Sequence, residues 1–374
     1  MKIPIAKPWF GPEEAAALRR PLDAGWVIQG PETAAFEKEF AAVVGAAHAC
    51  AVSSGTAALH LALLAVGVGP GDEVITASHS YISTANTVRH CGAEPVFVDI
   101  DPATCNMDPA GLDAARSPRT RAVLAVHQMG MPCDLNAIQA FTKRHGLALV
   151  EDAACAIGSE ICDATGVWSP IGRPRGEVAC FSFHPRKMIT TGDGGMVTTR
   201  DPALDSRTRR LRNQGMEIRD GAMTFPEIGF NYRMTDIQAA LGRVQLSRLP
   251  AMIARRREQA TIYTDLIAAV PGLAAPAEPA WGRSNWQSYC VRLPAGTDQA
   301  AVMQRLANRG VATRGGIMNA HEETPYLDPA RPPLPHSEAA RRGCLTLPIY
   351  HDLTAADQRR VIEELAKALD VGES

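Results

Sequence analysis

The stretch FSFHPRKMITTGDGG, residues 181–195, constrains the fold most strongly and raises the central question about this chain. It continues an apolar β-type run that begins at Val178, breaks at Pro185, and sets Lys187 just before the small-residue segment 190–195. Most lysines lie on the surface, in mobile loops. Here the apolar run predicts a core strand, and the glycines allow the backbone to close on a ligand. A lysine in this setting can lose its proton and serve as a Schiff-base amine.

Short β-type runs alternate with helical patterns through the first two-thirds of the chain. Buried strands are expected at 74–77, 95–99, 122–126 and 147–150, with a helix at 136–145. This alternation predicts an α/β fold with a largely parallel sheet that is covered on both faces. In such sheets, ligands bind at the carboxyl ends of the strands.

The pattern changes near residue 250. The segments expected beyond it are a long helix at 252–270, a strand at 288–293, a helix at 298–309, a strand at 344–350 and a final helix. That final helix opens with Thr354-Ala355-Ala356-Asp357, which resembles a capping box with Asp in place of Glu. We therefore predict a large domain over residues 1–250, N-terminal segment included, and a smaller α+β domain over residues 251–374.

Composition and charge narrow the classes of protein. Hydrophobic residues make up 46% and charged residues 21% of the 374 residues, as in ordinary globular proteins, and a net charge of −2 favours neither nucleic acid nor an acidic membrane. Nine cysteines are scattered singly, without zinc spacing, and their odd number argues against a disulfide framework. The first fourteen residues do not resemble a signal peptide, and no apolar run reaches the ~18 residues of a membrane span. We expect a cytoplasmic protein without a metal site.

A helix opening follows the apolar run that ends near residue 52. Ser54, Gly55 and Thr56 would leave backbone N–H groups free to hold an anion such as phosphate, although a plain serine N-cap explains the same residues. Segment 67–71 is rich in glycine but follows a helix and does not match the dinucleotide fingerprint. No Walker A loop is present either, so hydride-transfer and NTPase functions lack their glycine signatures.

Two adjacent carboxylates, Glu151 and Asp152, end the expected strand 147–150. Neighbouring strand residues point to opposite faces, so the two acids are expected to have different roles. Acids are common where a strand end meets solvent. A carboxylate fixed beside Ala153 and Ala154 could instead hold a cationic ring nitrogen, with room for a flat group.

Taken in order, these stretches resemble the DegT/DnrJ/EryC1/StrS family of aminotransferases. The matching segments are 25–31, 54–59, 71–75, 151–154, 181–195, 229–234 and 347–348. The resemblance implies the aspartate-aminotransferase type of fold (fold type I of the PLP-dependent transferases), with a large mixed, mostly parallel sheet domain and a smaller C-terminal α+β domain. It also implies pyridoxal 5'-phosphate (PLP) and its amino form (PMP) as the cofactor.

The same resemblance assigns roles to individual residues. Lys187 matches the lysine that forms the Schiff base and moves the proton, and Asp152 matches the carboxylate that pairs with the pyridine nitrogen. Tyr81, in the stretch SHSYISTAN (78–86), matches the aromatic residue stacked on the cofactor ring. Cys155 stands beside the ring face, where many members of the family have Gln or His. This departure bears on substrate choice more than on the cofactor chemistry.

The phosphate group has its own set of implied contacts. The backbone of Gly55 and Thr56 and the hydroxyl of Ser182 would hold it, and Asn231 would reach it from a second subunit. The resemblance therefore implies a homodimer with shared active sites.

The implied reaction moves an amino group from an amino acid, with glutamate as the expected donor, to a keto group of a nucleotide-linked deoxy sugar. A keto-cyclitol acceptor and a PLP-binding regulatory protein without turnover are the alternatives. Sugar dehydratases of the family carry histidine in place of the lysine, so Lys187 favours transamination. Trp26 and His321 are candidates for substrate contacts. Small molecules, rather than nucleic acids or membranes, are the expected partners.

Overall fold

The computed structural model describes residues 2–369. The helices are α1 (Pro12–Asp23), α2 (Pro31–Val44), α3 (Gly55–Ala65), α4 (Ser83–His90), α5 (Leu112–Ala115), α6 (Leu135–His145), α7 (Pro202–Arg212), α8 (Asp236–Ile267), α9 (Gln299–Asn308), α10 (Pro335–Gly343) and α11 (Ala355–Leu369). The strands are β1 (His48–Val52), β2 (Glu73–Ala77), β3 (Glu94–Val98), β4 (Thr120–Val126), β5 (Ala148–Asp152), β6 (Glu160–Cys162), β7 (Trp168–Pro170), β8 (Val178–Ser182), β9 (Gly195–Thr199), β10 (Glu217–Arg219), β11 (Ala222–Thr224), β12 (Gly282–Arg283), β13 (Tyr289–Arg292), β14 (Arg314–Gly315) and β15 (Cys344–Leu347). Short 3-10 helices are η1 (Pro109–Gly111), η2 (Gln128–Gly130), η3 (Ala320–Glu322) and η4 (Thr324–Tyr326).

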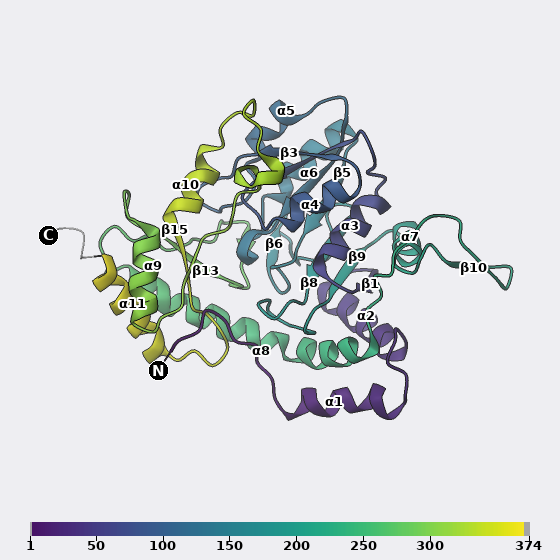
Figure 1. Cartoon of the computed structure of the whole chain (residues 1–374), viewed down its shortest axis with the longest axis horizontal. Coiled ribbons are helices and arrows are strands. Elements are labelled where there is room, and N and C mark those ends of the chain that lie inside the picture. Colours follow the sequence, from purple (N-terminus) through teal and green to yellow (C-terminus); the bar gives the residue numbers. More distant parts are fainter. Residues whose placement is uncertain (1, 370–374) are drawn as a thin grey trace.

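A seven-stranded sheet forms the centre of the molecule (Figure 1), in the order β1-β9-β8-β5-β4-β2-β3. The strands β8, β5, β4, β2 and β3 are parallel neighbours, while β9 pairs antiparallel with both β1 and β8. Six strands therefore end at the same edge, and β9 begins there. This confirms the predicted mixed, mostly parallel sheet.

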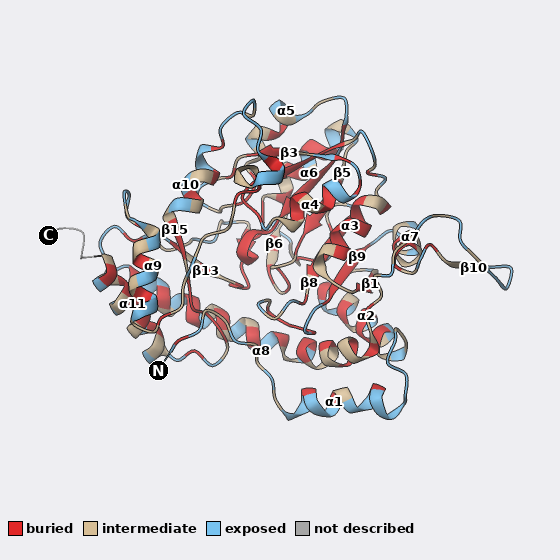
Figure 2. Cartoon of the chain, in the orientation of Figure 1, coloured by how far each residue is buried: buried red, intermediate tan, exposed pale blue. Residues whose placement is uncertain are grey.

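Both faces of this sheet are buried, as the continuous apolar strands predict. Along β4, Ala122 and Leu124 pack into one core with α3, whereas Val123 and Ala125 pack into another with residues of α2, α6 and α8. Figure 2 shows buried residues throughout the strands and along the inner sides of these helices. The helical layers fix the sheet rigidly, so its carboxyl edge is a stable platform for a site.

The long helix α8 begins 16 residues before the predicted position, at Asp236 rather than at residue 252. Thr235 and Gln238 form a capping box at its start. Pro250, which lacks a backbone N–H, lies inside the helix and makes the sequence look interrupted. Packing against α1 and α2 carries the helix through this point. The predicted domain boundary at residue 250 falls inside α8, and the division into two domains stays a prediction.

A second core lies beyond the large sheet, where a three-stranded sheet with the order β13-β15-β14 packs with α8, α9 and α11. The strand predicted at 344–350 ends at Leu347, because Pro348 cannot donate to the ladder. The capping box predicted at Thr354 is confirmed. The Asp357 amide donates to the Thr354 hydroxyl (3.1 Å), and the Asp357 carboxylate accepts from the Thr354 amide (3.1 Å).

The hairpin of β10 and β11 projects from the body of the molecule (Figure 1). It was not among the predicted strands, because it has no buried face to impose an alternating pattern. Its apolar side chains and those of the segment that follows are exposed: Ile218, Met223, Phe225 and Ile228. Ile228 is 89% exposed. An apolar surface of this kind marks an interaction site.

Within residues 2–369, no helix combines the length and apolar character that a bilayer span requires. The same residues contain no group of three or more His, Cys, Asp or Glu side chains arranged to hold a metal ion. All nine cysteines are free.

Candidate active site

The carboxyl edge of the large sheet brings distant parts of the chain together. Strand β5 ends at Asp152, β8 ends at Ser182, and β1 leads into the start of α3 at Gly55. The parallel pairing of β5 with β8 and the shared partner β9 place these three strand ends next to one another. Lys187 lies in the loop that follows β8. The residues predicted from four separate stretches thus meet at one edge.

Lys187 points its amine at a sulfur atom. Its Nζ lies 2.9 Å from Cys155 Sγ, and the side chain is half-buried. Burial lowers the pKa of Lys187, but the neighbouring Cys155 and Asp152 side chains outweigh that effect, so the pKa lies above its usual range. In the chain alone the amine is therefore an ammonium ion at neutral pH. This direction describes the chain without its cofactor, and the Schiff-base role of Lys187 stays a prediction.

Asp152 is a buried carboxylate held by two donors. The Ala154 amide donates to one oxygen (3.1 Å), and the Thr84 hydroxyl donates to the other (3.0 Å). Burial raises the pKa of Asp152, and these hydrogen bonds and the positive charge of Lys187 only partly counteract it. An ionised carboxylate in this position would gain from a cation placed against it.

Glu151 has a different environment, as the strand geometry predicts. Its carboxylate accepts hydrogen bonds from the amides of Arg175 (2.7 Å) and Gly176 (3.1 Å). These contacts tie the strand to the loop before β8. The prediction that Glu151 and Asp152 serve different purposes is therefore supported by their separate partners, because one fixes the backbone and the other faces Thr84.

The start of α3 closes tightly on the end of β8. A Cβ atom at Gly55 would lie 2.7 Å from Cβ of Ser182, so no larger residue fits without a shift. The Ser54 hydroxyl accepts from the Ala57 amide (3.1 Å), which confirms the serine N-cap. The cap leaves the first-turn amides of Gly55 and Thr56 without intrahelical acceptors. Those amides and the Ser182 hydroxyl form a small cradle for an anion.

Tyr81 and Thr84 extend from the segment between β2 and α4. The ring of Tyr81 is 67% exposed, which is unusual for an aromatic side chain so close to a sheet edge. The Tyr81 carbonyl accepts from the Thr84 amide (3.0 Å), and that turn aims the Thr84 hydroxyl at Asp152. Sequence reasoning singled out Tyr81 but missed Thr84. No local pattern marked Thr84, because its contact with Asp152 joins residues that are 68 positions apart in the sequence.

The two candidate substrate residues lie in different places. His321 reaches the sheet edge, where its Nδ1 lies 2.6 Å from the hydroxyl of Ser78, directly after β2. Trp26 lies between α1 and α2, 54% exposed, and donates only to the Gln29 carbonyl (3.2 Å). Asn231 is exposed on the segment after the hairpin. Within residues 2–369, neither Trp26 nor Asn231 hydrogen-bonds to the residues around Lys187.

These residues fit PLP. The cradle at Gly55, Thr56 and Ser182 suits a phosphate because the helix start carries free amides and partial positive charge. The buried Asp152 carboxylate suits a protonated ring nitrogen. The exposed ring of Tyr81 is free to lie against a flat group, and Lys187 supplies an amine that reaches this cluster.

The chain matches the DegT/DnrJ/EryC1/StrS aminotransferase family over residues 9–366. It belongs to that family. GDP-perosamine synthase of Caulobacter vibrioides is 41% identical over 372 residues, which cover 98% of each chain. The aminotransferase TlmJ from Streptoalloteichus hindustanus superposes with a TM-score of 0.92 at 37% identity, over 99% of this chain and 100% of TlmJ. DesI, solved in the presence of its TDP-sugar product, superposes with a TM-score of 0.91 at 33% identity, over 100% of this chain and 94% of DesI.

Family membership confirms three predictions. The fold is that of the PLP-dependent transferases, the chain is an aminotransferase, and its cofactor is PLP. The roles of the individual residues around Lys187 remain predictions that this geometry fits.

Proposed function

We propose that this aminotransferase moves an amino group from glutamate to a keto carbon of a nucleotide-linked deoxy sugar. The relatives support the sugar: one is named for GDP-perosamine synthesis, and DesI was solved with its TDP-sugar product. The observation that carries the proposal is the joint presence of Lys187 and Asp152 at one strand edge. A dehydratase of this family would carry histidine in place of Lys187, and a regulatory protein would have no need of either residue.

In the proposed reaction, PLP withdraws electrons from the substrate carbon that carries the amino group. Asp152 keeps the ring nitrogen protonated through its ionised carboxylate, which the Ala154 amide and the Thr84 hydroxyl orient. Lys187 Nζ, once free and neutral, would take the proton from the substrate carbon that carries the amino group and deliver it to the cofactor carbon. Cys155, 2.9 Å away, gives the freed amine a resting position between these steps.

Binding of the cofactor is proposed to depend on both ends of the cluster. The Gly55 and Thr56 amides and the Ser182 hydroxyl hold the phosphate, while Tyr81 covers one ring face. The close contact between Gly55 and Ser182 leaves no space for a side chain at position 55, which keeps the Gly55 amide and the Ser182 hydroxyl close together. Positioning of this kind fixes the reacting carbon near Lys187 Nζ.

We further propose a homodimer in which Asn231 of the partner subunit completes the phosphate site. Two observations support it. Asn231 is exposed and has no hydrogen bond to its own chain's cluster among the residues described. The nearby hairpin and the segment after it expose Ile218, Phe225 and Ile228. Burying these side chains against a second copy would favour association.

The function can be tested in two half-reactions. The PLP-loaded enzyme is mixed with glutamate, and the yellow PLP absorbance is followed as PMP forms. Guanosine- and thymidine-diphosphate-linked keto-deoxy sugars and a keto-cyclitol are then offered to the PMP form. The proposal predicts that glutamate discharges the colour and that a nucleotide sugar restores it. Restoration by the cyclitol alone would overturn the sugar assignment, and no discharge by any amino acid would overturn transamination.

A further inference from the structure

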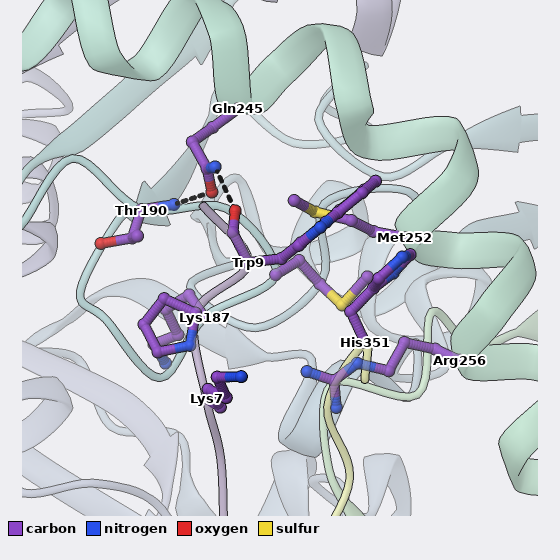
Figure 3. Close-up of a pocket in the computed structure, with 10 residues that line it drawn as sticks. Lys7, Trp9, Lys187, Thr190, Gln245, Met252, Arg256 and His351 are labelled. Carbon is purple, nitrogen blue, oxygen red and sulfur yellow. Dashed lines mark hydrogen bonds between the residues drawn. The ribbon is translucent and has the colours of Figure 1, made fainter. Parts of the chain in front are cut away.

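A small cleft lies beside the Lys187 loop, about 20 Å³ in volume (Figure 3). Four segments line it: the N-terminal segment, the Lys187 loop, α8 and the segment after β15. The lining residues are Lys7, Pro8, Trp9, Lys187, Met188, Thr190, Gln245, Met252, Arg256 and His351. Trp9 and His351 stack with their ring centroids 3.6 Å apart, which closes one side. Apart from Lys187, no residue to which a role is assigned above lines this cleft.

Arg256 is the unusual residue in it. Arg256 is only 8% exposed, and its one hydrogen bond within the described part of the chain runs from Nη1 to the Ile349 carbonyl (2.6 Å). No acid pairs with it among residues 2–369, and burial lowers the pKa of Arg256 to about 10. Neighbouring arginines on α8 differ, because Arg248 pairs with Glu14 (3.0 Å) and Arg255 with Glu258 (2.7 Å). A buried guanidinium without a counterion is expensive unless a ligand supplies one.

The other charges around the cleft have the same sign. Figure 3 shows the amine of Lys7 and the guanidinium of Arg256 directed toward each other across the space. Lys187 contributes to the wall. Two acids lie close to the lining residues, and each already has a cation: Asp352 pairs with Lys7 (2.7 Å), and Glu14, which accepts from Gln245, pairs with Arg248 (3.0 Å). Burial lowers the pKa of His351, so its ring is neutral and leaves this balance unchanged. The cleft therefore carries excess positive charge and lacks an anion.

The size of the cleft limits that anion. A volume of about 20 Å³ holds little more than the one water that needs roughly 10–15 Å³. A carboxylate group fits, whereas a sugar ring or a nucleotide does not. Arginine binds carboxylates through two parallel hydrogen bonds, and Lys7 could add a third charge-assisted contact.

We propose that Arg256 and Lys7 form the site for a carboxylate of the amino donor, which rests on the transaminase function proposed above. Lys187 is part of the cleft wall, so the bound acid would lie beside the residue that must receive its proton. Arg256 and Lys7 are thus substrate-binding residues for the first half-reaction only. The keto acceptor of the second half-reaction needs no such contact.

The test compares the half-reactions in variants of the holoenzyme. Arg256→Gln and Lys7→Gln are measured beside Arg255→Gln, a matched control on the same helix that lies outside the cleft. The donor concentration for half-maximal PMP formation should rise about 10- to 100-fold in Arg256→Gln and less in Lys7→Gln. It should stay unchanged in Arg255→Gln. The acceptor half-reaction, started from PMP-loaded enzyme, should be unchanged in all three.

Inhibition by chloride tests whether the cleft binds the anionic group of the donor. It should compete with the donor in the wild type and lose that effect in Arg256→Gln. Unchanged donor dependence in both Arg256→Gln and Lys7→Gln, with an active wild type, overturns the inference and leaves the proposed function intact. Equal losses in both half-reactions also overturn it, since they indicate a structural role. Lys7 is mostly exposed, so its variant tests the site even where Arg256→Gln fails to fold. A wild type that reacts with no amino acid overturns the proposed function itself.

Discussion

The carboxyl edge of the large sheet and the projecting β10–β11 hairpin differ in whether their side chains find partners within the same chain. At the edge, Asp152 and Ser182 end buried strands and have partners within the chain. The hairpin and the segment after it leave Phe225 and Ile228 largely exposed, 61% and 89%. One region is thus built by a single chain, whereas the other is suited to meet a second surface. Cofactor binding at the sheet edge should therefore be sensitive to changes of single atoms. Association of two chains should depend on the total apolar area of the hairpin and the segment after it, residues 217–228, which we name the arm.

The largest effect is expected at the edge, from Lys187→Ala. Loss of the amine removes both covalent attachment of PLP and proton transfer, and the latter alone contributes about 10²- to 10⁴-fold to rates. The glutamate half-reaction, followed by absorbance, should fall by at least that factor. Lys143→Ala, at an exposed position on α6, is the control and should react normally. Substantial turnover by Lys187→Ala would show that Lys187 is not the residue that transfers the proton.

The second-largest effect is expected from Asp152→Asn. The amide keeps the shape of the carboxylate but cannot hold the ring nitrogen protonated, so PLP should still attach while proton abstraction slows severely. Single-turnover rates with glutamate measure this directly. Asp163→Asn, in the β6–β7 connection, serves as the comparison. Near-normal rates in Asp152→Asn would show that this carboxylate is not the partner of the ring.

The arm can be tested through association. Ile228→Asp places a charge on the most exposed apolar residue of the segment after the hairpin, and we expect the dimer dissociation constant to rise by about tenfold or more, roughly 1.4 kcal/mol. Analytical ultracentrifugation gives the constant. Val167→Asp introduces the same charge at an exposed apolar position of the β6–β7 connection and should have no effect. Equal behaviour of the two variants would argue against the arm as the contact.

Gly55→Ala probes the closeness of the phosphate cradle. The added Cβ would meet Ser182 at 2.7 Å, and overpacking of this kind costs about 1–3 kcal/mol. PLP affinity should weaken by about tenfold, as measured by fluorescence titration of the PLP-free protein. Gly69→Ala, where an added Cβ has open space, is the matched control. Unchanged affinity in Gly55→Ala would show that the cradle tolerates a shift.

The smallest effect concerns stability without PLP. Because burial raises the pKa of Asp152, the stability it contributes is fully present below the unfolded value of about 3.9 and is lost as the pH rises through the folded value. Asp152→Asn removes this pH-dependent loss. The PLP-free variant should therefore melt at or above the wild-type temperature at pH 8, and this advantage should disappear at acidic pH. A wild type that is more stable than the variant at pH 8 would contradict it.

The sequence predicted the edge far better than the surfaces around it. Strands β2 to β5 follow from continuous apolar runs, and Glu151 and Asp152 from strand alternation. The start of α8 was missed because Pro250 resembles a helix boundary, whereas packing against α1 and α2 lets the helix continue through it. Thr84 and Arg256 were missed for another reason. Each acts through a contact with residues distant in sequence, and nothing in the local pattern distinguishes them from ordinary helical residues.

The most direct measurement of the central claim is reduction of the yellow holoenzyme with borohydride, followed by peptide mapping. Reduction should fix the pyridoxyl group to a single peptide and to Lys187 within it, with loss of activity in proportion to labelling. A label on another lysine, or a colour that persists without any label on Lys187, would contradict the account.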